Sequence, residues 1–494
     1  MGVWALLSLY QKGYSTTNTK IVINMYYDVL SMDAGRLENL LRSEVELYKS
    51  RTRCSNELHE RARRCLPSGV ASCYQLFDPY PFYVDKSEGN SVIDVDGNRL
   101  LDFHCGYGVT LFGYRHPYIV ESATRLFTEQ GFLVSLPTTS LVLASEHLAQ
   151  RYQLPFWRFL NSGTEATLDA IRLARARLDR PYIIKIESGY HGHHDGVWVS
   201  VHAGERDHQS PDDEVEDIPQ IPFCRGIPSD VSSLTLIAEF NNLASVERLF
   251  VKYLDQVAGV IVEPILLNCS MVKPTNDFLQ KLIVLCRAHR AAVIFDLVKI
   301  NTAISMQHIT AFWDKDSGFG PDVYTLGKGL SGGSCPVGAI GMTAEFAELI
   351  EKKNVQISGT YNGNSYAIGM VLAVQEFVTE EKQNTLAELS QTLRDGIAES
   401  VAKFKLPCMV DCVGNKGCIT FFKNGSDLSP VRNYQHYIKN VDLVMEQLFV
   451  YYFINRGIWV QARDEWSLSF SHSRDDIHLF ISMFEQFAST LANY

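Results

Sequence analysis

Short apolar segments alternate with helix-like patterns through the middle of the chain. The apolar segments at 182–186, 258–262 and 291–295 have the length of buried strands. Between them, apolar side chains recur at the spacing of one helix face, at Leu168, Ile171, Ala174 and Leu178 and again at Phe278, Leu282 and Leu285. This alternation predicts a mostly parallel sheet covered by helices, which is an α/β fold.

The two ends of the chain have different patterns. Residues 26–66 are polar with one apolar face, which predicts a helical arm that packs on a partner surface. The apolar positions of that face are Leu37, Leu40, Leu41, Val45 and Leu47. The segment 94–98 predicts a tight turn between two strands, and helical patterns occur again at 371–404 and within 466–494.

These patterns divide the chain into four segments. We expect an N-terminal arm at 1–66, the first part of a small domain at 67–120, a large domain at 121–370 and the second part of the small domain at 371–494. The small domain is then an α/β unit completed by both chain ends. An acidic insert at 205–222 is expected to be a solvated loop, because its like charges repel one another.

Composition narrows the possible partners. The 494 residues are 46% hydrophobic and 20% charged, as in an ordinary globular protein. The 56 acidic residues outnumber the 45 Lys and Arg residues, so no basic excess favours nucleic acid or anionic lipid. The longest apolar run, at 448–454, is far shorter than the about 18–20 residues that cross a bilayer. We expect a soluble protein that has neither nucleic acid nor a membrane as a partner.

The 11 cysteines are scattered along the chain. The closest pair, Cys408 and Cys412, has no second pair to match it, which argues against a disulfide framework and against a structural zinc site. Reduced thiols favour a cytoplasmic location. Lys12, Lys20 and the Ser/Thr stretch at 15–19 are weakly similar to a transit peptide, so mitochondrial import is the alternative, although no arginine occurs there.

Ligands of open parallel sheets bind beyond the carboxyl ends of the strands, so polar residues at those ends are candidate site residues. The first group is Ser162, Gly163 and Thr164, which lie between an apolar segment and the helix-like pattern from Leu168 onward. Their backbone N–H groups and hydroxyls predict a phosphate site at a helix N-terminus. A simple helix cap is the alternative interpretation of this turn.

The second group is the loop at 188–195, which follows the strand predicted at 182–186. Tyr190 is a candidate aromatic platform for a planar ligand. His191, His193 and His194 invite a zinc interpretation, but they lack the helical spacing of known metal motifs, so we expect no metal. A structural, hydrogen-bonded role for these histidines is the third alternative.

The last two candidates are single charged residues. Asp296 directly follows the predicted strand at 291–295, where a buried carboxylate needs a partner. Lys328 follows another apolar segment and has glycine on both sides, which allows a ligand to approach its amine closely. A helix cap or a salt bridge for Asp296, and a surface position for Lys328, are the alternatives.

Together, these features are the ones that pyridoxal 5′-phosphate requires: an anion cradle, a ring cover, an anion beside the pyridine nitrogen and an amine for a Schiff base. From about residue 67 onward the chain resembles the class III aminotransferases of fold type I, and most of all their glutamate-1-semialdehyde 2,1-aminomutase branch. The matching stretches lie at 94–98, 161–166, 190–193, 262–264, 294–296, 325–329 and 359–364.

The resemblance implies roles for individual residues. Lys328 is expected to form the Schiff base, and Asp296 to keep the pyridine nitrogen protonated. Tyr190 and Val298 are expected to pack on the two ring faces, and Ser162, Gly163 and Thr164 to bind the phosphate. Thr360 resembles the residue that completes the phosphate site of the neighbouring subunit, which implies a homodimer.

The chain also departs from the family pattern. The family has an acidic residue where this chain has Leu297, and Thr-Gly where it has Ile300 and Asn301. Arg115, Arg463 and Arg474 are all candidates for binding a substrate carboxylate, with no means to choose among them. These departures favour a specialised transaminase, of the kind found in secondary metabolism, over a housekeeping aminomutase.

Three functions remain open at this point. The first is an aminotransferase that moves an amino group between a small-molecule amino donor and a carbonyl acceptor. The second is an intramolecular aminomutase, or a racemase, on the same scaffold. The third is a non-catalytic family member that serves as a binding protein, although such a protein would not need Lys328, Asp296, Tyr190 and the phosphate turn together.

Overall fold

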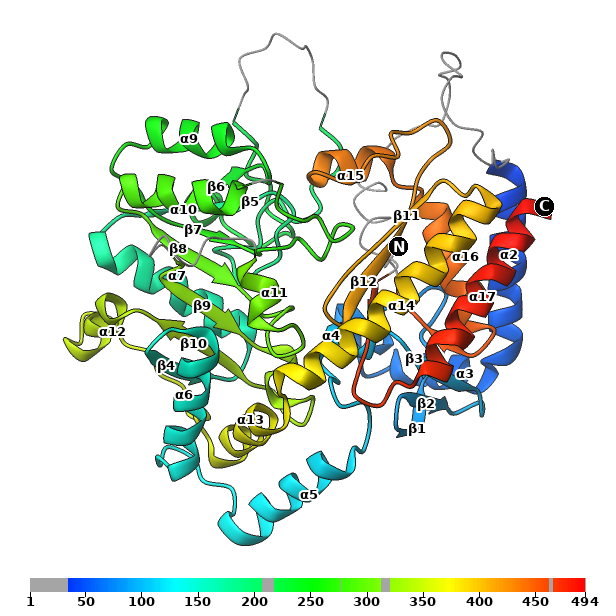
Figure 1. The fold of residues 1–494 in the computed structure, drawn as a ribbon, viewed down its shortest axis with the longest axis horizontal. Coiled ribbons are helices and arrows are strands. Elements are labelled where there is room, and N and C mark those ends of the chain that lie inside the picture. Colours follow the sequence, from blue (N-terminus) through cyan, green and yellow to red (C-terminus); the bar gives the residue numbers. More distant parts are fainter. Residues whose placement is uncertain (1–33, 207–216, 276, 312–319, 462–464, 494) are drawn as a thin grey trace.

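The computed structural model describes residues 34–206, 217–275, 277–311, 320–461 and 465–493. These residues form a large and a small domain that lie side by side (Figure 1). Three features expected from the sequence lie outside the described residues. They are the transit-like segment within 1–33, the acidic centre of the insert at 207–216, and Arg463.

The large domain contains one seven-stranded sheet. In spatial order the strands are β4 (Phe156–Leu160), β10 (Gly338–Met342), β9 (Val323–Leu326), β8 (Ala292–Asp296), β7 (Val257–Val262), β5 (Tyr182–Ile186) and β6 (Thr235–Ala238). Strand β10 runs antiparallel to both of its neighbours, β4 and β9, and all other neighbouring strands of the sheet are parallel. The expected mostly parallel sheet is therefore confirmed.

Helices cover both faces of this sheet (Figure 1). On one face lie α7 (Gly163–Leu178) and α12 (Ala344–Glu351), and on the other lie α6 (Thr139–Tyr152), α9 (Leu243–Lys252), α10 (Phe278–Ala288) and α13 (Ser365–Phe377). Successive strand residues alternate between the two cores, so Ile183 packs with α7 whereas Ile184 packs with the opposite layer. Short helices α8 (Ser229–Ser232) and α11 (Met306–Thr310) complete the domain.

The small domain contains two small sheets. The first has the order β1 (Val84–Glu88), β2 (Ser91–Asp94), β3 (Arg99–Asp102) and β13 (Ile458–Trp459). The second is antiparallel, with the order β11 (Cys408–Val413), β12 (Lys416–Phe421) and β14 (Glu465–Ser467). Because β13 pairs with β3, the two chain ends complete one domain, as the sequence predicted.

Helices α14 (Glu380–Phe404), α16 (Leu443–Ile454) and α17 (Arg474–Asn493) pack against these small sheets, and α15 (Tyr434–Asn440) lies beside them (Figure 1). The segment at 371–404 is two helices rather than the one expected. Thr379 ends the continuity, since its side chain accepts a hydrogen bond from the backbone N–H of Lys382 and so caps α14. The connecting elements are η1 (Pro67–Gly69), η2 (Cys73–Gln75), α4 (Cys105–Gly108), α5 (Pro117–Arg125) and η3 (Leu126–Gln130).

The N-terminal arm does not need a partner surface, so that expectation was wrong. Its helices α2 (Ala34–Arg51) and α3 (Arg53–Ala62) belong to the small domain, and α2 packs along α16. Tyr48 is 1% exposed and its ring lies 5.7 Å from that of Tyr451. The hydrophobic pattern of the arm shows that it has an apolar face but not which surface covers that face. The surface is α16, a helix of the same chain that is apolar on all sides.

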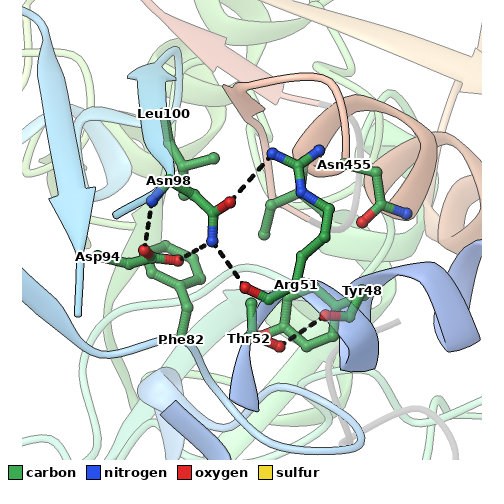
Figure 2. Close-up of a pocket in the computed structure, with 9 residues that line it drawn as sticks. Tyr48, Arg51, Thr52, Phe82, Asp94, Asn98, Leu100 and Asn455 are labelled. Carbon is green, nitrogen blue, oxygen red and sulfur yellow. Dashed lines mark hydrogen bonds between the residues drawn. The ribbon is translucent and has the colours of Figure 1, made fainter. Parts of the chain in front are cut away.

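Hydrogen bonds fix the end of α2 to the predicted turn at 94–98, as Figure 2 shows. The guanidinium of Arg51 donates to Asn98 Oδ1 at 3.1 Å, and Asn98 Nδ2 donates back to the carbonyl of Arg51 at 3.0 Å. Asp94 in turn accepts the backbone N–H of Asn98 at 2.7 Å. The arm and the first strands therefore form one connected unit.

Within the part of the chain that the structure describes, we find no helix with the length and the apolar content that a membrane crossing needs.

Candidate active site

The candidate site lies at the carboxyl ends of β8 and β9, next to the N-terminus of α7. Asp296 is the last residue of β8 and pairs with Thr325 of β9. Gly327 and Lys328 follow β9 directly. The parallel arrangement thus brings two of the predicted residues to the same edge of the sheet.

The phosphate turn reaches the same place. Ser162 caps α7, because its side chain accepts the N–H of Glu165 at 3.2 Å. A Cβ on Gly163 would lie 2.8 Å from a methyl group of Val298, and a Cβ on Gly327 would lie 3.4 Å from the Cα of Gly163. The close approach of these backbones requires glycine. The phosphate turn, Val298 and the loop that carries Lys328 are therefore in contact.

Asp296 is 4% exposed and accepts three hydrogen bonds from donors that carry no charge. Its Oδ1 accepts the N–H of Val298 at 3.0 Å and the hydroxyl of Thr325 at 2.9 Å. Its Oδ2 accepts the Nδ1–H of His191 at 2.7 Å. A carboxylate has about four acceptor positions, so one remains for a cofactor proton.

His191 sets the orientation of this carboxylate. Burial lowers the pKa of His191 more than the adjacent Asp296 raises it, so the ring is neutral and donates through Nδ1. Its Nε2 is buried and has no hydrogen-bond partner among the described residues. Of the alternatives for the loop histidines, the hydrogen-bonded role agrees with the structure, because His191 bonds to Asp296 and His193 to Thr164.

Tyr190 lies on the same loop. Its backbone N–H donates to Glu263 at 2.9 Å, and its ring makes an edge contact with Tyr74. Burial raises the pKa of Glu263 to about 7, and the nearby Asp296 adds to the shift. Across the described residues no group of histidine, cysteine and carboxylate side chains has an arrangement that would hold a metal ion.

Lys328 begins the short turn η4 (Lys328–Ser331) with its backbone in the left-handed region, at a φ of 47°. A non-glycine residue in this region costs about 1 kcal/mol or more, and such strain is common at functional sites. Burial, followed by the charge of Lys299, lowers the pKa of Lys328 to about 8. Part of the amine population is therefore unprotonated near neutral pH and can act as a nucleophile or a base.

Thr360 lies outside this cluster in the single chain. It is exposed, and its carbonyl accepts a hydrogen bond from Ser135 at 3.5 Å. The same loop is joined to the phosphate turn, because Asn161 Nδ2 donates to Asn362 Oδ1 at 2.8 Å. Of the arginines proposed for a substrate carboxylate, Arg115 and Arg474 are both exposed.

Sequence reasoning missed four charged residues around Lys328. Glu263 was noted only as part of a matching stretch. Lys299 follows Val298 directly, and its ammonium forms an ion pair with Glu465 of the small domain at 2.7 Å. Lys416, also of the small domain, is 2% exposed. The last two lie far along the chain from every motif, so no local signal pointed to them.

The residues present fit pyridoxal phosphate. The helix N-terminus and two hydroxyls suit the phosphate, Asp296 has one open acceptor position, and Lys328 supplies an amine of lowered pKa. Comparison with known proteins decides the family: the model of aminotransferase class III matches residues 75–469. The chain belongs to the class III aminotransferase family. It is therefore an enzyme of a family that uses pyridoxal phosphate, as the resemblance implied.

Related sequences are named as aminomutases. Glutamate-1-semialdehyde 2,1-aminomutase of Methanopyrus kandleri is 31% identical over 437 residues, which cover 87% of this chain and 96% of the relative. The enzyme of the same name from Hyperthermus butylicus is 33% identical over 380 residues, covering 76% of this chain and 85% of the relative. These names agree better with the second of the functions left open above than with the first.

Solved structures confirm the fold type. A glutamate-1-semialdehyde aminomutase from Pseudomonas aeruginosa in complex with PMP superimposes with a TM-score of 0.82 at 22% identity, covering 94% of this chain and all of that one. An omega-transaminase from Sphaerobacter thermophilus has a TM-score of 0.79 at 28% identity, covering 89% of this chain and 98% of that one.

Proposed function

We propose that this enzyme moves an amino group between two carbons of one substrate, as an aminomutase of the glutamate-1-semialdehyde type. The observation that carries this proposal is the likeness to aminomutases over most of the chain, at 31% identity for the relative from Methanopyrus kandleri. The departures at Leu297, Ile300 and Asn301 favour a transaminase, but they are three positions within a likeness to aminomutases that spans most of the chain. The aminomutase is therefore the first candidate.

Pyridoxal phosphate bound here supplies an aldehyde that takes up the amino group and a ring that withdraws electrons from the substrate's α carbon. We assign Lys328 to hold the cofactor covalently and, once its amine is released, to carry the proton at the α carbon. The lowered pKa of Lys328, about 8, suits this exchange. Asp296 holds the proton of the ring nitrogen, and His191 orients Asp296.

The remaining residues bind and orient the cofactor in this proposal. The N–H groups and hydroxyls of Ser162, Gly163 and Thr164 bind the phosphate at the N-terminus of α7. Tyr190 and Val298 pack on opposite faces of the ring. The contact of Val298 with Gly163 supports its place under the ring, beside the phosphate turn.

We further propose a homodimer in which Thr360 completes the partner's phosphate site. The side chains around Thr360 support this, because large apolar groups are exposed there: Phe127, Phe132, Leu136 and Tyr361 are each about half exposed or more, at 48% to 59%. Phe132 and Tyr361 lie together, with ring centroids 6.3 Å apart. An exposed apolar cluster of this kind is typical of a protein interface.

The second candidate function is that of a transaminase, specifically a specialised transaminase of secondary metabolism. It is favoured by the unusual residues beside Asp296 and by the omega-transaminase structure at 28% identity. The two candidates differ in whether the amino group leaves with the first product. A racemase on the same scaffold would move no amino group at all.

One experiment separates these functions. The purified enzyme, loaded with pyridoxal phosphate, is mixed with glutamate-1-semialdehyde and, in a second sample, with an amino donor that carries no aldehyde or ketone group. An aminomutase converts many equivalents of glutamate-1-semialdehyde to its isomer 5-aminolevulinate. A transaminase accumulates no 5-aminolevulinate, and with the simple donor it stops after one equivalent and leaves the cofactor as pyridoxamine phosphate. Chromatography of the product and absorbance of the cofactor report the two results. Arrest after one equivalent, with any amino donor that reacts, would place the transaminase first.

A further inference from the structure

One lysine of the small domain is buried without a carboxylate partner. Lys416 is the first residue of β12 and is 2% exposed. Its Nζ donates to the hydroxyl of Ser467, the residue opposite on β14, at 3.0 Å. Over the described ranges we find no ion pair and no second hydrogen-bond acceptor for this ammonium. A buried charge with one hydroxyl partner is costly, so this position has a poor structural rationale.

The neighbouring Lys299, in contrast to Lys416, has a carboxylate partner. Lys299 Nζ donates to Glu465 and to Asn268 Oδ1, at 2.8 Å and 2.9 Å. Glu465 is thus already engaged in an ion pair and acts on Lys416 only from a longer range. The small group of Lys299, Lys416 and Glu465 therefore has one positive charge more than it has negative charge.

Lys416 faces the large domain. Alternate residues of β12 point to opposite faces of their sheet. Phe421 packs in the core of the small domain, whereas Cys418 packs with the large-domain core and the Thr420 hydroxyl contacts that of Ser270. Lys416 lies on the same face of β12 as Cys418 and Thr420. Its side chain consequently lies on the side of the sheet that meets the large domain.

A short series of contacts connects Lys416 with the proposed reacting amine. A Cβ on Gly108 would lie 2.1 Å from Lys416 Nζ, so the ammonium rests against the backbone of Gly108. The carbonyl of Gly108 in turn would lie 3.1 Å from a Cβ on Gly329, the residue after Lys328. Burial, with contributions from Lys299 and Lys328, lowers the pKa of Lys416 to about 7. The two lysines are near enough to affect each other's charge.

The loop between them has two strained positions. Cys105 and Tyr107 are non-glycine residues with positive φ values of 49° and 60°, and they alternate with Gly106 and Gly108, which adopt such values without strain. Asp102 holds the start of the loop, since its Oδ1 accepts the N–H of Cys105 at 2.9 Å. Strain of this kind persists where the surrounding structure enforces it, and it gathers at ligand sites.

We propose that Lys416 and Ser467 bind a carboxylate of the substrate, at the end of the molecule away from the reacting amino group. Ser467 accepts from Lys416, so its own hydroxyl hydrogen can be donated to the ligand. The carboxylate would balance the extra positive charge of the group. The inference rests on the proposed function and deepens it, because it assigns the two residues that recognise the substrate's carboxylate.

The first test compares two probes of equal carbon chain, 4-aminobutyrate and 1-aminobutane. Each is titrated into the cofactor-loaded enzyme while the absorbance of the cofactor is followed. We expect 4-aminobutyrate to bind about tenfold tighter or more than 1-aminobutane. Its carboxylate forms a hydrogen-bonded charge pair with Lys416, and 1-aminobutane has no group that can do so. Lys416→Met should bring the ratio to about one. An unchanged ratio in Lys416→Met overturns the proposal.

A matched control uses Lys403→Met, which removes an exposed lysine of α14 that pairs with Glu485. This variant should keep the wild-type ratio. If Lys416→Met does not fold, Ser467→Ala tests the same site. We expect this variant to lower the ratio of the affinities for 4-aminobutyrate and 1-aminobutane by about threefold or more. A wild-type ratio in folded Ser467→Ala then overturns the proposal.

A second test needs no reaction, so it separates this inference from the proposed function. Glutarate is titrated calorimetrically into the wild-type holoenzyme at pH 6 to 9. Binding should weaken as the pH rises through about 7, where Lys416 loses its proton; Glu465, Lys299, Lys328, Cys105 and His104 are the other titratable groups facing it. Pronounced weakening in Lys416→Met supports the carboxylate site even if no amine reacts. Equal glutarate binding in wild type and variant overturns it.

Discussion

Two surfaces that face each other across the domain boundary are built in different ways. The cofactor edge of the large domain consists of the ends of β8 and β9 and the start of α7. There the buried anion, Asp296, accepts three hydrogen bonds. The opposing face of the small domain, formed by β12 and β14, holds a buried cation, Lys416, that donates one.

This difference separates the two tasks of the site. The cofactor edge orients its charged group with neutral donors from its own domain, so its geometry is set before any substrate arrives. The small-domain face leaves part of its hydrogen-bonding capacity open. We infer that the cofactor edge provides the chemistry common to the family, whereas the small-domain face determines which substrate is accepted.

The largest expected effect is at the cofactor edge. Lys328→Ala should lower turnover by about 10³–10⁴-fold, because it removes both the covalent anchor and the proton carrier. Borohydride treatment of the wild-type holoenzyme, followed by peptide mapping, should place the cofactor on Lys328. A label on another lysine, or full turnover in Lys328→Ala, would disprove the assignment.

The next effect concerns the anion of the same edge. Asp296→Asn should keep pyridoxal phosphate bound and lower turnover by about 10²–10³-fold, since an amide cannot hold the ring nitrogen protonated. Cofactor content and rate are measured together, and Thr325→Val serves as a control that removes one donor to Asp296 but leaves the carboxylate in place. Near-normal turnover in Asp296→Asn would show that the carboxylate has another role.

A stability measurement sharpens the comparison on the small-domain side. Lys416→Met should stabilise the protein by about 1–4 kcal/mol while impairing recognition of carboxylates, because it removes a poorly partnered buried charge. Burial lowers the pKa of Lys416 to about 7 from 10.5. Below pH 7 the buried ammonium of Lys416 therefore destabilises the folded protein in full. This destabilisation decreases as the pH rises from 7 towards 10.5. Urea unfolding at pH 6.5 and pH 9 should show a smaller difference at pH 9; a destabilised variant would contradict this account.

The smallest expected effect tests the subunit boundary. Thr360→Ala should weaken pyridoxal phosphate about tenfold without altering the fold, because one hydrogen bond to the phosphate is lost. Equilibrium dialysis measures the affinity, and sedimentation measures the oligomeric state. A wild-type monomer that retains its cofactor fully would rule out a phosphate site shared between subunits.

Residue order alone predicted the cofactor edge well. Ser162, Gly163 and Lys328 each lie in the turn that follows a strand, and parallel strands bring their carboxyl ends to one edge, so local position was enough to place them together, whereas Val298 was implied only by the family resemblance. The substrate side was not predicted. Arg115 and Arg474 were chosen by residue type, and both are exposed.

The N-terminal arm and the small-domain face show which contacts could not be predicted from the sequence. The apolar face of α2 was visible in the sequence, but its binding surface on α16 depends on residues some four hundred positions away, among them Tyr451 and Asn455. Likewise, Lys416 is an ordinary lysine in the sequence. It becomes a candidate for substrate binding only because β12 turns it towards the large domain, against Gly108.

The sequence by itself therefore determined the α/β fold, the family and the short motifs that follow the strands. Periodicity, turn chemistry and the position of a residue after a strand are local properties, which a linear pattern records. Only the tertiary structure decided which charges are buried and which of them have partners. Burial and the pKa of a lysine depend on every element packed around it, here two domains whose contacting residues lie far apart along the chain.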